Sequence, residues 1–295
     1  MMNKKVMITL LVIAIVGVSC MAFAACDTNS DDFNNFDKSE IKVGFQSGTT
    51  GQFYTEDYAN LTPVSYTNAM LAVQDMLNGR VDYVITDIAP AKSIAAKIGK
   101  RVKVVDINLT EEKYCFAVNP NDTKGIMDKL NKFLSDNAAE LKDLQNEYIQ
   151  GTNEKKVIYS ATNPKNPLTV ATSADFPPFE NVSGDGYEGY DLEVMAMFCA
   201  ANGYDLVINN MDFDSIVLNV GNGQSDIGAA ALTWSEDRAK SVKFSDSYYD
   251  ATQVVICLSN DTTFNDCKTK ADVEKILAEL ATKKSEASGE AVSGQ

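Results

Sequence analysis

The chain contains no histidine, so any chemistry that it performs must rest on other side chains. This absence removes Ser–His and Cys–His nucleophile arrangements and the zinc sites that need histidine. Carboxylates, lysines, tyrosines and cysteines remain available for catalysis, but no Cys-x-x-Cys motif points to a metal. The sequence therefore predicts neither a metal nor a cofactor.

Two residues of opposite charge have the chemistry to bind a small zwitterion. Asp87 ends an apolar segment, where a carboxylate is expensive to bury unless a cation meets it. Arg238 offers paired donors that match the geometry of a carboxylate. Their alternative roles are a helix cap for the segment from Pro90 and an ordinary surface arginine.

A glycine-bearing loop, residues 46–51, precedes a predicted helix and carries the hydroxyls of Ser47, Thr49 and Thr50. Backbone N–H groups and the positive end of a helix dipole suit a carboxylate there. The loop lacks the lysine of a phosphate-binding P-loop. It is therefore a candidate for binding the carboxylate of a small ligand.

The composition limits the partners of the chain. Its 41 acidic and 26 basic residues give a formal net charge of −15 over 295 residues. A nucleic-acid partner would need a basic face, so the acidity argues against one. The length predicts one large domain or two lobes, and neither low-complexity sequence nor a heptad repeat is present.

The first residues are typical of an export signal rather than of a fold. Residues 1–25 contain two lysines, an apolar run and a stretch of small residues that ends at Cys26. Residues 23–26 resemble a bacterial lipobox, which predicts lipidation of Cys26, anchoring to the cell membrane and an extracytoplasmic location. Residues 26–40 then form a polar tether. The alternative is a plain secretory signal cut before Cys26.

The remaining chain alternates short apolar strands with amphipathic helices, which predicts an α/β fold. Asn-Gly pairs end two helices, at Gly79 and Gly203, because glycine tolerates the left-handed cap. Polar residues, Asp87 and Thr233, end two of the buried strands. Ligands of open α/β sheets bind at the carboxyl ends of strands, so two facing lobes would offer these side chains to one cleft. The predicted strands are 41–45, 81–86, 168–172, 205–208 and 226–232, and the predicted helices are 68–77, 126–148, 190–201, 213–220 and 271–284.

Several motifs together resemble a known family. The segments 168–180, 189–193, 211–214, 233–238 and 242–249 follow one another as in polar amino-acid-binding proteins of ABC importers, and the loop 43–51 and strand 81–87 resemble their second lobe. The resemblance covers about residues 41–258. It implies the type II periplasmic-binding-protein fold, with two α/β lobes around a hinge and a ligand cleft. It also implies delivery of an amino acid to a permease, with no enzymatic activity.

The order of these motifs is rotated relative to the family, so the chain is identified as circularly permuted. The family's second lobe comes first, as residues 41–118, and residues 119–258 hold its closing helices and first lobe. Residues 259–295 are a tail with a helix and a disordered end. This order predicts one covalent crossover, near residues 115–118, and a tail that docks non-covalently. We expect a monomer; a rearranged remnant that swaps lobes is the alternative.

The resemblance assigns roles to the candidate residues. Arg238 and Thr233 contact the ligand carboxylate, and Asp87 with the backbone of Ala231 contacts the ammonium. The side chain of the ligand meets aromatic walls and selective polar groups. The full set of ligand-binding candidates is Arg238, Thr233, Ala231, Asp87, Thr49, Thr50, Ser47, Gln46, Phe176, Phe213, Ser173 and Asp175.

Three questions stay open at the level of sequence. Relatives that prefer cationic ligands often carry Asp where Ser173 stands, so neutral polar and basic amino acids both remain candidates. A dehydratase of the cyclohexadienyl or arogenate type would use the same fold as an enzyme. Cys257 and Cys267 are near enough in sequence for a local disulfide, but spacing does not establish one.

Overall fold

The computed structural model describes residues 40–58, 60–153 and 156–290, with the side chains of residues 281–290 left aside. The predicted signal (residues 1–25), Cys26 and all but the last residue of the tether 26–40 lie outside the described residues. The last five residues of the predicted tail lie outside them too.

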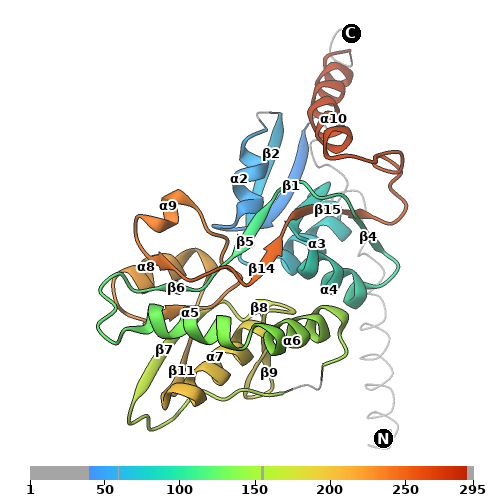
Figure 1. Cartoon of the computed structure of the whole chain (residues 1–295). Helices are drawn as coiled ribbons and strands as arrows, with labels where there is room; N and C mark the ends of the chain where they lie inside the picture. Colours follow the sequence, from blue (N-terminus) through green and yellow to red (C-terminus); the bar gives the residue numbers. More distant parts are fainter. Residues whose placement is uncertain (1–39, 59, 154–155, 291–295) are drawn as a thin grey trace, which may run out of the picture. The chain divides into compact units, whose positions relative to one another are not determined.

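The first lobe is built on a five-stranded sheet with the order β2-β1-β3-β15-β4 (Figure 1). Its strands β1 and β2 are parallel, as are β1 and β3, while β15 runs antiparallel to β3 and β4. The helices α2 and α10 pack on one face of the sheet, and α3 and α4 pack on the other. The elements are β1 (Ile41–Gln46), α2 (Thr50–Glu56), β2 (Leu61–Tyr66), α3 (Ala69–Leu77), β3 (Tyr83–Asp87), α4 (Ile88–Ile98), β4 (Val102–Val105), β15 (Gln253–Leu258) and α10 (Lys270–Glu290).

The second lobe repeats this plan, with a sheet of the order β11-β7-β12-β6-β13. The inserted strand β6 runs antiparallel to β12 and β13. A small sheet, β10-β9-β8, lies beside it. The elements are β6 (Ala117–Val118), α5 (Ile126–Asp136), α6 (Ala138–Gln150), β7 (Pro167–Thr172), β8 (Asp175–Phe176), β9 (Glu180–Ser183), β10 (Gly186–Glu188), α7 (Tyr190–Asn202), β11 (Asp205–Asn210), η1 (Phe213–Ser215), α8 (Ile216–Gly221), β12 (Ile227–Gly228), α9 (Glu236–Ala239) and β13 (Lys243–Phe244).

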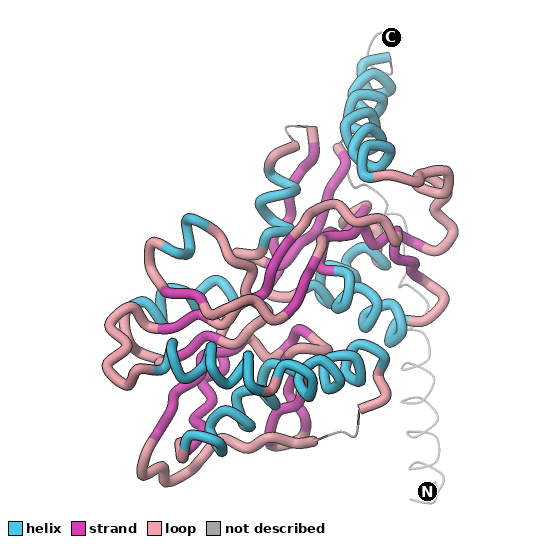
Figure 2. The backbone as a smooth tube through the Cα atoms, viewed as in Figure 1, coloured by secondary structure: helices cyan, strands magenta, loops and turns pink. Residues whose placement is uncertain are grey.

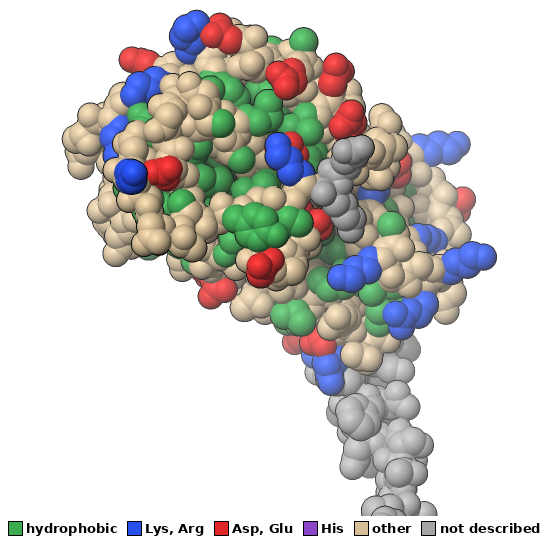
Figure 3. All heavy atoms as spheres, turned by 90° about the horizontal axis from the view of Figure 1, so that it is seen from below, with side chains coloured by type: hydrophobic (Ala, Val, Ile, Leu, Met, Phe, Trp, Pro, Cys, Tyr) green, Lys and Arg blue, Asp and Glu red, His purple; other side chains and the backbone are tan. Residues whose placement is uncertain are grey.

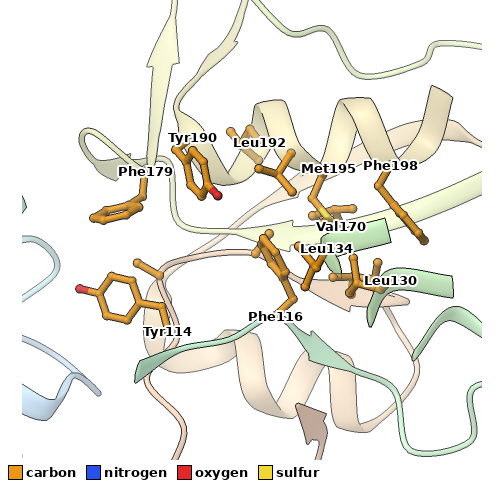
Figure 4. Packing of buried hydrophobic residues seen from close by; sticks show 14 of the residues in the cluster. Tyr114, Phe116, Leu130, Leu134, Val170, Phe179, Tyr190, Leu192, Met195 and Phe198 are labelled. Atoms are coloured by element: carbon orange, nitrogen blue, oxygen red, sulfur yellow. The ribbon is translucent and has the colours of Figure 1, made fainter. Parts of the chain in front are cut away.

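The core of the second lobe lies between its sheet and the helices α5, α6 and α7 (Figure 4). Phe116 and Val170 from the sheet meet Leu130 from α5 and Phe198 from α7, and all four are fully buried. Because α7 is apolar on nearly all its faces, it is buried on almost every side rather than amphipathic. This core fixes the strand ends that lead to the other lobe.

Two short strands connect the lobes. The strand β5 (Glu112–Tyr114) lies between β4 and β6, and β14 (Tyr249–Ala251) lies between β13 and β15. They pair antiparallel, with Tyr249 opposite Tyr114, and both run between the two sheets in Figures 1 and 2. The hinge is therefore a two-stranded ribbon with both strands covalently continuous.

This arrangement corrects two predictions. The chain crosses between the lobes twice rather than once, and β15 belongs to the first sheet, so the second lobe does not extend to residue 258. The physical reason is that Val254, Val255 and Ile256 are apolar in succession, so the strand needs cover on both faces. The first sheet provides that cover between β3 and β4.

The predicted tail is part of the first lobe. Val273 and Leu277 of α10 are fully buried in one cluster with Ile41 and Val43 of β1. The helix reaches beyond the predicted 271–284, to Lys270–Glu290. The prediction of a separately docked tail is therefore wrong, because α10 completes one face of the first sheet.

Most other predicted elements are confirmed, with local differences. Asn68 caps α3, accepting a hydrogen bond from the N–H of Leu71 at 2.9 Å, and Gly79 adopts the left-handed conformation after it. The predicted helix 126–148 is two helices that meet at Asn137. The predicted strand 226–232 leaves the sheet after Gly228, because Ala231 has a positive φ of 48°. Cys257 and Cys267 are unpaired thiols.

We predict that Leu277→Ala lowers the free energy of unfolding by about 2–4 kcal/mol, because it leaves a cavity under α10. Urea unfolding followed by circular dichroism measures this change. Lys275→Ala, at an exposed position of the same helix, is the control and should change the value by about 0.5 kcal/mol or less. Equal effects of the two substitutions would show that α10 is not part of the core.

Candidate functional site

One small pocket collects most of the predicted site residues. It has a cavity volume of about 10 Å³ and lies where the chain leaves β1, β3 and β8, facing the segment from η1 to α9. Its lining consists of Gln46, Thr49, Thr50, Asp87, Phe176, Phe213, Ala231, Thr233 and Arg238. All nine are among the twelve residues predicted from the sequence, and they come from both lobes.

The other three predicted residues lie beside the pocket rather than in its wall. Ser47 donates a hydrogen bond to a carboxylate oxygen of Asp214 at 3.1 Å, across the two lobes. Ser173 donates to Asp175 at 3.3 Å. Burial raises the pKa of Asp175, although hydrogen bonds from neighbouring side chains, Asn68 first among them, oppose the rise.

Arg238 is held in place by neutral groups. Ser235 caps the short helix α9 and accepts a hydrogen bond from the backbone N–H of Arg238 at 3.2 Å. One guanidinium nitrogen donates to the carbonyl of Thr233 at 2.6 Å, and the other donates to the carbonyl of Gly48 at 2.9 Å. The guanidinium carbon lies 5.4 Å from the centre of the Phe213 ring. The carbonyls orient the cation, while the carboxylates of Glu112 and Asp87 lie near enough to oppose the lowering of its pKa by burial.

Asp87 supplies the opposite charge from the first lobe. Its side chain is 5% exposed and accepts a hydrogen bond from the hydroxyl of Tyr114 at 2.5 Å. Burial raises the pKa of Asp87 to about 7, and the negative charge of Glu112 adds to the rise. Although Asp87 precedes α4, its side chain makes no capping hydrogen bond. The alternative role as a helix cap is therefore wrong.

The loop after β1 leaves one buried amide unsatisfied. Thr49 donates its hydroxyl to the carbonyl of Gln46 at 2.8 Å, which folds the loop back on itself. Gly48 has a φ of +76°, and a Cβ there would lie 2.8 Å from Asp214 of the facing lobe. The Gln46 side chain is 2% exposed, and neither its oxygen nor its nitrogen has a hydrogen-bond partner among the described residues. A buried amide in this state indicates a polar group that enters from the pocket.

The aromatic residues differ in their place relative to the pocket. Phe176 and Phe213, both predicted site residues, line it, whereas Phe179 is fully buried and packs edge-on against Tyr114 with ring centres 5.2 Å apart. Trp234 is 51% exposed. It lines a larger and more open groove beside the hinge strands, where Glu112 and Thr233 also contribute. Since this groove holds neither Arg238 nor Asp87, the smaller pocket is the better candidate.

Sequence reasoning missed Glu112, a buried residue of the hinge strand β5. One of its carboxylate oxygens accepts hydrogen bonds from the hydroxyls of Thr50 and Thr233, each at 2.7 Å. The other oxygen accepts from Thr110 at 2.6 Å and from the amide of Gln253 at 3.2 Å. The carboxylate thus joins the two lobes behind the pocket. The alternation of Glu112 and Tyr114 around the exposed Lys113 is the signal that would have revealed it.

Buried acids dominate the electrostatics around the pocket. Glu180 is fully buried, and its burial together with the charge of Asp191 raises its pKa well above the usual range. Burial also raises the pKa of Asp191 to about 7 and lowers the pKa of Arg238. By contrast, acidic and basic side chains lie intermixed among apolar ones on the outer face shown in Figure 3. The buried acids therefore lose their protons less readily than exposed carboxyl groups, because burial disfavours the charged form.

The described part of the chain contains neither a metal-binding cluster nor a membrane-spanning helix. No group of three or more Cys, Asp or Glu side chains within it could hold a metal ion. None of its helices is long and apolar enough to span a membrane.

Two α/β lobes with identical sheet orders, each receiving one antiparallel strand from the other half of the chain, define a type II periplasmic-binding-protein fold. The sequence of part of the chain is also similar to that of a known family. Residues 168–288 match the model of the bacterial extracellular solute-binding proteins, family 3, which confirms the predicted resemblance for residues 168–258.

Individual relatives match over a limited length. The arginine-binding extracellular protein ArtP of Bacillus subtilis (strain 168) is 35% identical over 92 residues, which are 31% of this chain and 36% of that protein. A probable histidine-binding protein of Neisseria gonorrhoeae is 34% identical over 107 residues, 36% of this chain and 40% of that protein. The chain therefore spans well under half the length of these relatives. An ancestral arginine-binding protein solved with glutamine is 34% identical over 29% of this chain and 38% of that one, with a TM-score of 0.28.

We predict that Glu112→Ala destabilises the protein by about 3–5 kcal/mol, because it leaves the hydroxyls of Thr50 and Thr233 and the amide of Gln253 without their acceptor. Thermal or urea unfolding measures the loss. Glu111→Ala, at the exposed neighbouring position, is the control and should be nearly silent. A silent Glu112→Ala would contradict the bridging role.

Proposed function

We propose that this protein is an extracytoplasmic binding protein that captures a polar amino acid between its lobes and delivers it to an ABC-importer permease. The observation that carries the proposal is the placement of Arg238 and Asp87, from opposite lobes, in the wall of one pocket. A free amino acid carries one anionic and one cationic group on the same carbon. A pocket with one partner for each group suits that ligand.

The contacts assign a role to each side of the ligand. Arg238 and the backbone N–H groups at the start of α2 bind the carboxylate. Asp87 binds the ammonium together with the carbonyl of Ala231, since the N–H of Ala231 is already bonded to Asp191. Thr50 and Thr233 give their hydroxyl hydrogens to Glu112, so they offer oxygen lone pairs or backbone groups to the ligand rather than O–H donors. Gln46, Phe176 and Phe213 contact its side chain.

The class of side chain follows from charge. Asp87 lines the pocket and Asp175 lies beside it, so two acids stand near its one arginine, and the two curated relatives above are named for arginine and histidine. A basic amino acid is therefore the first candidate, with Asp175 beside Ser173 as the acid nearest to the position where relatives bind cationic side chains. Neutral polar amino acids such as glutamine come second.

Closure of the lobes supplies the mechanism. In the closed arrangement Arg238 bonds to Gly48 and Ser47 bonds to Asp214, both across the cleft. The ribbon β5–β14 acts as the hinge, and a ligand that touches both lobes shifts the equilibrium toward the closed state.

We extend the proposal to the N-terminal residues and to the order of the two lobes. Residues 1–25 direct export, lipidated Cys26 anchors the protein to the membrane, and residues 26–40 are the tether. The lobes follow one another in permuted order, and the protein acts as a monomer. An enzymatic alternative of the dehydratase type is not favoured, because the relatives above are named as binding proteins.

The experiment is isothermal titration calorimetry against the twenty amino acids, with ornithine and cystine added. We expect one basic or polar amino acid to bind, and Arg238→Ala to weaken it at least about a hundredfold by removing a charge-assisted bidentate contact. Arg80→Ala, which removes a partly exposed arginine paired with Asp75, is the control and should leave the affinity unchanged. Unchanged affinity of Arg238→Ala would refute this site, and a wild-type protein that binds no ligand of the panel would refute the function.

Affinity should depend on pH through Asp87. Its carboxylate must be ionised to bind an ammonium, and burial holds the pKa of Asp87 at about 7 in the free protein. Because a proton must leave Asp87 below that value, the affinity should fall up to about tenfold per pH unit as pH decreases from about 7 to 5, and should level off above about 8. Titration calorimetry at several pH values measures this dependence.

Asp87→Asn is the matched control for the pH dependence. It should bind weakly and lose the pH slope. In the free protein the raised pKa means that Asp87 opposes folding increasingly as pH rises from about 4 through 7. Asp87→Asn should therefore be more stable than the wild type at pH 8 and similar to it at pH 4. A flat affinity profile of the wild type would rule out this role of Asp87.

A further inference from the structure

Ala231 adopts a backbone conformation that alanine avoids. Its φ of 48° is left-handed, a region that it shares with only Asp122 among the non-glycine residues that the structure describes. A non-glycine residue in this region costs of the order of 1–2 kcal/mol and persists only where its surroundings impose it. Since Ala231 lines the pocket between Thr233 and the end of β12, its conformation decides which backbone group faces the ligand.

The side chain bonded to the backbone of Ala231 is that of Asp191, at the start of α7. One oxygen of its carboxylate accepts the backbone N–H of Ala231 at 2.9 Å. Asp191 is fully buried, and its second oxygen has no hydrogen-bond partner among the described residues. A buried carboxylate without a cation is costly, so core packing alone does not explain its presence.

The same oxygen of Asp191 reaches toward the hinge. It also accepts the hydroxyl of Tyr248 at 2.7 Å. The backbone N–H of Tyr248 donates to the carbonyl of Tyr114 in β5 at 3.0 Å, and its ring stacks on Phe116 with centres 4.4 Å apart. Asp191 is therefore connected through one side chain to the segment that leads into β14.

We propose that Asp191 is a positioning residue for the ligand site, which acts through Ala231 and touches no ligand itself. By binding the N–H of Ala231, it turns that group away from the pocket and keeps the chain in the left-handed conformation. The carbonyl of Ala231 then faces the pocket as an acceptor for the ligand ammonium, beside Asp87. This inference rests on the proposed amino-acid binding and adds a residue that the sequence motifs did not assign to the site.

Substitution of Asp191 separates positioning from folding. Asp191→Leu removes the acceptor and leaves the Ala231 N–H and the Tyr248 hydroxyl without a partner, so the melting temperature should drop by a few degrees while the protein stays folded. Ligand affinity, measured by calorimetry with the amino acid found for the wild type, should nevertheless fall at least about tenfold. Asp191→Asn retains an oxygen for the Ala231 N–H and should stay within about threefold of the wild type.

A double-mutant cycle tests whether Asp191 acts through Ala231. Glycine adopts the left-handed conformation without strain, so Ala231→Gly should recover most of the affinity that Asp191→Leu loses. Glu180→Gln is the control for a neighbouring buried acid with no bond to Ala231, and it should leave the affinity within about twofold. An equal loss in the alanine and glycine backgrounds overturns the proposal, as does an unchanged affinity of Asp191→Leu.

A measurement without ligand keeps this proposal separate from the proposed function. Amide hydrogen exchange of Ala231, followed by NMR in the free protein, should accelerate at least about tenfold in Asp191→Leu, because the N–H loses its buried acceptor. Unchanged exchange overturns the positioning role even if the ligand is never found. If exchange accelerates in Asp191→Leu while the wild-type protein binds no amino acid, the positioning role is supported and only the proposed function is refuted.

Discussion

The antiparallel pairing of β5 with β14 is the constraint on which the rest of the structure depends. Each strand leaves one sheet and delivers the next strand of the chain, β6 or β15, into the middle of the other sheet. Neither lobe can therefore complete its sheet without the chain of its partner. The ribbon also carries Glu112 and Tyr114, whose hydrogen bonds fix Thr50, Thr233 and Asp87. The residues that connect the lobes therefore also hold the pocket residues in place.

The distribution of charge is the basis for proposing a zwitterionic ligand. Asp87 is buried at the end of β3, and its raised pKa records an unfavourable electrostatic environment in the free protein. Arg238 is oriented by the carbonyls of Thr233 and Gly48, and the charges of Glu112 and Asp87 act on it from nearby. A ligand that carries an ammonium and a carboxylate group on one carbon provides a counter-charge for Asp87 and for Arg238 at the same time. The strain at Ala231, maintained by Asp191, belongs to the same arrangement.

The sequence predicted the parts of the fold that depend on local patterns. The cap at Gly79 and the strand end at Asp87 follow from residue type and periodicity. The motifs predicted all nine residues that line the pocket, but spacing in the sequence does not give the distances between them in space. The second crossover was missed, because the apolar run from Val254 to Ile256 calls for burial on both faces but does not show which of the two sheets has room for the strand. Glu112 and Asp191 were missed for a related reason: a buried acid in a strand or at a helix start shows its importance only when its distant partners are known.

The exposure of Trp234 has a practical consequence. It is the sole tryptophan of the chain, half open to solvent, and its neighbour in sequence, Thr233, is shared by the ligand pocket and the groove along the hinge. Indole emission is sensitive to the polarity and mobility of its surroundings. The native protein therefore contains one intrinsic fluorophore at the boundary between the lobes, and its spectrum reports their motion without any label.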